Sequence, residues 1–97
     1  MNELMKFLKK SQKKLVKVDY ETLVNTANQI EALKKEKDKN KKAAVKQAIN
    51  RNLDGLGIVA KSKHYSSAEY SSLYVNVNNR LILQEAIGIA RKLLREV

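Results

Sequence analysis

The stretch YVNVNNRLIL, residues 74–83, decides the fold class of this 97-residue chain. As a β-hairpin turning at Asn78-Asn79, it would make the protein α+β; as part of a helix, it would make the protein all-α. The hairpin would place apolar and polar side chains together on both of its faces, whereas a half-buried hairpin should have one apolar face. Asn-Asn is also a weaker type I′ turn than Asn-Gly, and a lone two-stranded hairpin is marginally stable. The pairing therefore disfavours the hairpin.

The helical interpretation agrees better with the residues that come before this stretch. Ser66-Ser67-Ala68-Glu69 is a capping box, in which the Ser66 hydroxyl accepts from the Glu69 N–H and the Glu69 side chain reaches back. Apolar residues then follow at steps of three and four: Tyr70, Leu73, Tyr74, Val77 and Leu81. The stripe resumes one position out of phase: Ile82, Ala86, Ile89, Leu93 and Val97. We therefore predict a helix over residues 67–96 with a bend near 78–82.

The proline and glycine content of the chain is typical of a helical protein. The chain contains no proline and only three glycines, fewer than sandwiches and barrels usually need. Apolar stripes of helical period predict three further helices, near residues 2–18, 20–37 and 42–61, with Asp19 capping the second. The whole chain, 1–97, is thus expected to form one domain, an all-α, antiparallel up-and-down four-helix bundle. The alternative is a winged-helix-like α+β fold with a small hairpin at 74–83.

Positive charge dominates the chain and is concentrated in its first half. Twenty Lys and Arg residues face ten Asp and Glu residues, for a net charge of +10, and sixteen of the cations are lysine. The predicted helix over 2–18 has an apolar side formed by Leu4, Leu8, Leu15 and Val18. Its opposite side carries the lysines Lys6, Lys9, Lys10, Lys13, Lys14 and Lys17. These six are the candidate contacts with an anionic surface, either a membrane or a phosphate backbone; the alternative is an ordinary bundle helix with a solvated outer face.

The second half offers a different set of candidate contacts. A bend in the last helix would leave an irregular, partner-facing segment there, formed by Asn76, Asn78, Asn79 and Arg80. Arg91 and Arg95 are the other candidates, although cations in a last helical turn also interact favourably with the helix dipole.

No residue pattern typical of catalysis or metal binding occurs. The chain has no cysteine and a single histidine, His64, so a thiolate or zinc site is not expected. Glycine-rich phosphate loops and HExxH patterns are also absent. No apolar run approaches the roughly 20 residues that span a bilayer, and the first residues do not read as a leader. We therefore expect a cytoplasmic protein that is no enzyme and uses neither cofactor nor metal.

Residues 44–74 resemble the small bacteriocin immunity proteins of Gram-positive bacteria, the enterocin and pediocin group. The resemblance lies in AVKQAINRNLDGLGIVAKSK, which spans residues 44–63, and in the SSAE capping sequence that precedes Leu73 and Tyr74. It implies an antiparallel four-helix bundle and a basic, cytoplasmic, monomeric protein without enzymatic activity. It also implies protection of the producing cell by engagement of the bacteriocin–receptor complex at the membrane.

Two hypotheses for function follow from the sequence. In the first, the chain is a non-enzymatic interaction protein, a bacteriocin immunity protein whose partner is a protein or an anionic membrane surface. The alternative is a small basic nucleic-acid-binding or regulatory protein, such as one from a phage or another mobile element. The low arginine content weighs mildly against specific DNA recognition.

Overall fold

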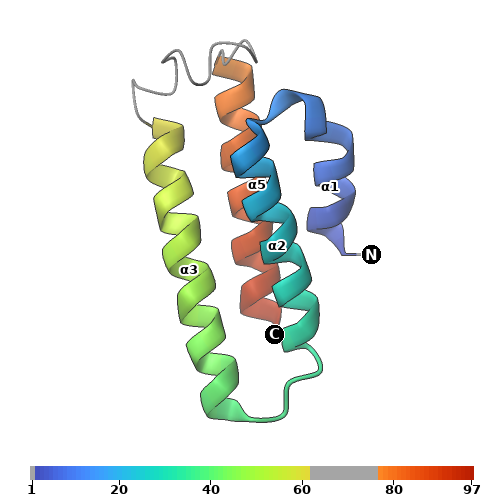
Figure 1. The fold of residues 1–97 in the computed structure, drawn as a ribbon, viewed down its shortest axis with the longest axis vertical. Coiled ribbons are helices and arrows are strands. Elements are labelled where there is room, and N and C mark those ends of the chain that lie inside the picture. The colour runs from blue at the N-terminus through green and yellow to red at the C-terminus, as the bar shows by residue number, and fades with distance from the viewer. Residues whose placement is uncertain (1, 62–76) are drawn as a thin grey trace.

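The computed structural model describes residues 2–61 and 77–97, which form four α-helices and one short 3₁₀ helix. In chain order these are α1 (Glu3–Ser11), η1 (Gln12–Lys14), α2 (Lys17–Leu33), α3 (Lys39–Lys61) and α5 (Val77–Glu96). Successive α-helices run antiparallel, and each packs on its neighbours, with α5 closing the bundle against α1 (Figure 1). The predicted all-α, up-and-down bundle is confirmed.

The described part of the stretch 74–83 is helical. The backbone from Val77 to Leu83 lies in α5, so the hairpin that turned at Asn78-Asn79 is wrong. Residues 74–76 and the capping box at 66–69 lie outside the described residues. The preference for helix was therefore correct wherever the structure can test it.

The apolar stripe of α5 has a different phase from the predicted one. The buried residues of this helix are Leu83, Ala86, Ile87, Ala90, Leu93 and Leu94, whereas Leu81 is 52% exposed. Leu81 was the last member of the first predicted stripe, and the structure places it outside the core. From Leu83 to Leu94 one regular stripe at steps of three and four faces the core. The bend near 78–82 stays a prediction.

The predicted first helix, 2–18, is wrong at its C-terminal end. The chain leaves α1 after Ser11, passes through η1, and runs extended at Leu15 and Val16 before α2 begins. Helices ending at 18 and starting at 20 would leave one residue to reverse the chain, whereas bundle connections usually take about 2–8. The turn therefore uses residues 12–16. Asp19 is not the N-cap residue of α2; Val16 holds that position, and Asp19 lies buried in the first turn.

The core lies between α2, α3, α5 and the shorter α1. The predicted stripe of α2 is buried at Leu23, Ala27, Ile30 and Leu33. Helix α3 continues through both of its glycines, as predicted, and buries Ile49, Leu53, Leu56 and Ala60. Its first turn is capped by Asp38, whose Oδ1 accepts from the Asn40 N–H at 2.9 Å. The segment 34–38 is thus short, because α3 begins at Lys39 rather than near residue 42.

Asn2 joins the start of α1 to the middle of α2. Its Oδ1 accepts from the Met5 N–H at 2.9 Å, which caps α1, and its Nδ2 donates to the Ala27 carbonyl at 3.1 Å. The side chain is only 8% exposed. Hydrogen bonds from Lys34 and from Asn2 also hold the pKa of the Glu31 carboxyl below its ordinary value. Asn2 therefore fixes both the beginning and the position of α1.

Replacement of Asn2 by alanine should destabilise the protein by about 2 kcal/mol, because it removes a helix cap and a buried inter-helix hydrogen bond together. Chemical denaturation followed by circular dichroism measures this difference. Asn28→Ala is the matched control, since Asn28 is exposed on α2 and alanine is a better helix former. An equal loss in both variants would contradict the role of Asn2.

Two leucines that are two residues apart test which side of α5 faces the core. Leu83→Ala should cost about 3 kcal/mol, since Leu83 is fully buried and its truncation leaves a cavity. Leu81→Ala should change the free energy of unfolding by no more than about 0.5 kcal/mol. A larger loss of stability for Leu81→Ala than for Leu83→Ala would mean that Leu81, and not Leu83, faces the core.

Candidate functional site

One end of the bundle combines exposed hydrophobic side chains with lysines. We call it the η1 end; it is where α1 ends, α2 begins, α3 ends and α5 begins, the upper end in Figure 1. Among the residues whose burial the structure describes, three large hydrophobic side chains are exposed: Val18 at 63%, Ile58 at 71% and Leu81 at 52%. Each lies within the first or last few residues of its helix at this end.

The break between α1 and α2 explains the exposure of Val18. Because Leu15 and Val16 turn into the core at the chain reversal, the helix that follows starts in a new phase, and Val18 points to solvent. Sequence reasoning had placed Val18 on the apolar side of one long helix. Val18 is therefore a surface residue and not, as predicted, a core residue.

The six candidate lysines are all exposed, but they do not share one helix face. Lys6, Lys9 and Lys10 lie on α1, Lys13 and Lys14 form most of η1, and Lys17 is the first residue of α2. The last three therefore lie at the η1 end itself. The one acid in residues 2–18, Glu3, lies at the opposite end of α1, where its carboxylate is 3.4 Å from the Lys92 ammonium. Residues 12–18 thus contribute lysines and no carboxylate to this end, and the nearest acid along the chain is the buried Asp19 in the first turn of α2.

Arg80 has a structural role at the same end. Its Nε donates to the Ala60 carbonyl at 2.8 Å, which satisfies one of the carbonyls left open at the end of α3. This contact holds the start of α5 against the end of α3. Asn78 and Asn79 lie in the first turn of α5, and Asn76 lies outside the described residues, as does His64.

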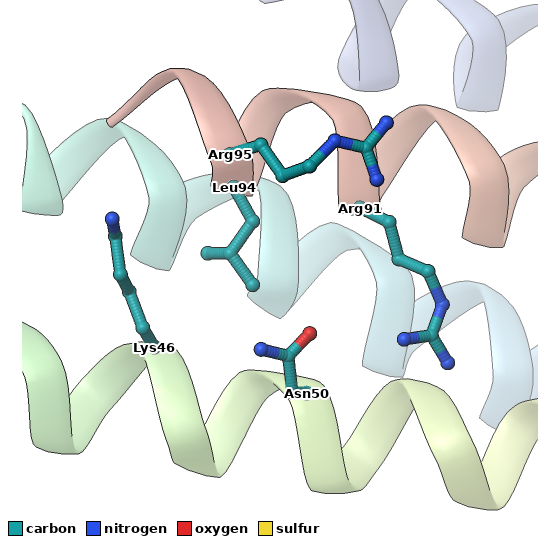
Figure 2. Close-up of a pocket in the computed structure, with 5 residues that line it drawn as sticks. All are labelled: Lys46, Asn50, Arg91, Leu94 and Arg95. Carbon is teal, nitrogen blue, oxygen red and sulfur yellow. The ribbon is translucent and has the colours of Figure 1, made fainter.

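A second basic feature lies between α3 and α5, away from the η1 end. A shallow cavity of about 260 Å³ is lined by Lys46, Asn50, Arg91, Leu94 and Arg95, and we call it the basic cleft. Figure 2 shows Lys46 and Asn50 pointing from α3 toward α5, with Leu94 and Arg91 pointing back toward α3. The structure thus brings two sequence-predicted arginines together with two residues that sequence reasoning missed.

The two missed residues of the basic cleft had one usable signal. Lys46 and Asn50 are four residues apart on α3, as Arg91 and Arg95 are on α5, so each pair lies on one helix face. The sequence did not show that these two faces oppose each other, because that depends on how α3 and α5 pair.

A further cavity, of about 330 Å³, lies between the end of α2 and the start of α3. Its lining includes Glu36 and Lys41, whose charged atoms are 3.9 Å apart. The two charges offset each other, so this cavity favours neither anions nor cations.

The described residues, 2–61 and 77–97, contain neither a metal-binding cluster nor a membrane-spanning helix. No group of three or more His, Cys, Asp or Glu side chains is arranged to hold a metal ion. None of the described helices combines the length and the hydropathy that crossing a bilayer requires.

Comparisons with known proteins add no relatives. No protein-family model, no curated protein and no solved structure gives a significant match to this chain.

Proposed function

We propose that this chain is a non-enzymatic binding protein that docks with its η1 end on the anionic inner surface of a membrane. The observation that carries the proposal is the coincidence of Val18, Ile58 and Leu81 with Lys13, Lys14 and Lys17 at one end of the bundle. Exposed aliphatic side chains can enter the headgroup region, while lysines interact with anionic lipids.

The free energies that these side chains contribute to membrane binding support a reversible attachment. Each lysine close to an anionic membrane surface contributes about 1 kcal/mol. Full burial of a valine, leucine or isoleucine contributes about 1.5–3 kcal/mol, and insertion into the headgroup region recovers part of that. Neither kind of residue alone anchors a protein stably, and stable attachment generally needs two such contributions.

The residue types also favour a membrane over nucleic acid. The described residues of the η1 end present lysines and aliphatic side chains, whereas sequence-specific nucleic-acid binding depends on arginine and aromatic side chains. Three of the four arginines take part in other arrangements: Arg80 caps α3, and Arg91 and Arg95 line the basic cleft.

The biological role that fits this docking is bacteriocin immunity in the cytoplasm, as the resemblance over residues 44–74 implies. In that role the η1 end brings the protein to the membrane, where the bacteriocin–receptor complex forms. Expression of the chain in a sensitive Gram-positive strain, followed by challenge with a pediocin-like bacteriocin, tests this role. Survival equal to that of cells without the chain would exclude it.

Co-sedimentation with vesicles of phosphatidylglycerol and phosphatidylcholine tests the docking. The variant K13Q/K14Q/K17Q should bind about 100-fold more weakly, given about 1 kcal/mol for each lysine. The matched control K35Q/K37Q/K39Q removes the same charge from exposed positions at the other end of the bundle and should bind almost like the unmodified chain. V18S/I58S/L81S should also weaken binding, without loss of helical content.

Equal losses in the two lysine variants would mean that only net charge matters, and the η1 end would have no special role. A gel shift with random DNA and RNA is run in parallel. Tight nucleic-acid binding with a steep dependence on salt, and no binding to vesicles, would establish the nucleic-acid alternative instead.

A further inference from the structure

We propose that the basic cleft between α3 and α5 binds a small soluble anion of the phosphate class, such as a diphosphate group. Phosphate binding is argued from residues other than those of the η1 end, so it stands independently of membrane docking; only the choice of a soluble ligand rests on the proposed function.

The charge of the basic cleft has one sign. Of the five described residues that line it, Lys46, Arg91 and Arg95 are cationic and none is acidic. Asp54 lies beside it and is bound to Arg91, with Nη2 and Oδ1 2.7 Å apart. Asp54 can offset only one of the three cations, so the basic cleft keeps a net positive charge that an anion would balance.

The donor groups suit phosphate oxygens. A guanidinium offers a planar set of N–H donors that matches phosphate geometry, and a lysine ammonium adds a compact charge. The Asn50 amide adds a neutral donor from α3, between the two helices (Figure 2). The contact with Asp54 also restricts the Arg91 side chain before any ligand arrives, which lowers the entropy lost on binding.

The size and the position of the basic cleft limit the ligand. Its volume of about 260 Å³ lies just below the roughly 300–1,000 Å³ of pockets that hold drug-sized molecules, so the ligand is small. Twelve residues of α3 separate Lys46 from Ile58, which corresponds to about 18 Å along the helix. With the η1 end on a membrane, the basic cleft would lie beyond the lipid headgroups. This last step rests on the proposed function and favours a soluble phosphate over a lipid headgroup.

Titration of the full chain with inorganic diphosphate, followed by NMR at constant ionic strength, tests the proposal. A saturable shift of the Asn50 side-chain amide is expected, and saturation should raise the Tm by about 5 °C. K46Q/R95Q should weaken the binding by about 100-fold, roughly tenfold for each cation. This variant keeps Arg91 and therefore its contact with Asp54.

K35Q/K37Q is the matched control, since it removes two charges from exposed positions between α2 and α3. It should bind diphosphate within about twofold of the unmodified chain, because neither lysine lines the basic cleft. An equal loss in this control, or no saturable shift at Asn50, would overturn the proposal.

Vesicles that contain phosphatidic acid distinguish the source of the phosphate. K46Q/R95Q should sediment with them like the unmodified chain. If this variant loses vesicle binding and free diphosphate does not bind, the ligand is a lipid headgroup and the soluble class is wrong. If vesicle binding fails for every variant while diphosphate binds, membrane docking fails and the basic cleft remains a phosphate site.

Discussion

The burial of Leu15 and Val16 at the reversal between α1 and α2 is the constraint on which the other features depend. A helix that continued straight to residue 18 would leave the chain no room to reverse before α2. Here the chain becomes extended at these two residues, and both are buried. The reversal limits α1 to nine residues and sets the phase in which α2 begins. It also places Lys13, Lys14 and Val18 at the surface of the η1 end.

The sequence predicted the architecture because each helix carries its own apolar periodicity. Four stripes at steps of three and four, with no proline to interrupt them, were enough to predict an antiparallel bundle. The errors in assigning core residues arose close to the ends of helices. Leu81 and Val18 fit their stripes by spacing, yet both lie near a helix start, where the packing of neighbouring helices decides which residues are covered.

The candidate sites were only partly predictable, for a related reason. Lysine content identified the N-terminal segment, but the clustering at the η1 end depends on a turn that periodicity does not show. The basic cleft depends on which faces of α3 and α5 oppose each other, and this is a property of the tertiary structure. Arg91 and Arg95 were identified by their type and position, whereas Lys46 and Asn50 became meaningful only beside them.

The nine-residue length of α1 has a consequence for how the protein opens. An isolated helix shorter than about 12–15 residues is marginal in water, so α1 is helical because Leu4 and Leu8 are docked and Asn2 is bonded to α2. Helices α2, α3 and α5 are each much longer and pack on one another without it. We therefore expect α1 to be the part of the bundle that detaches most easily, as a local unfolding unit with a lower free energy of opening than the whole chain. The shape of the lysine surface on α1 and η1 is thus maintained by the docking of a single helix.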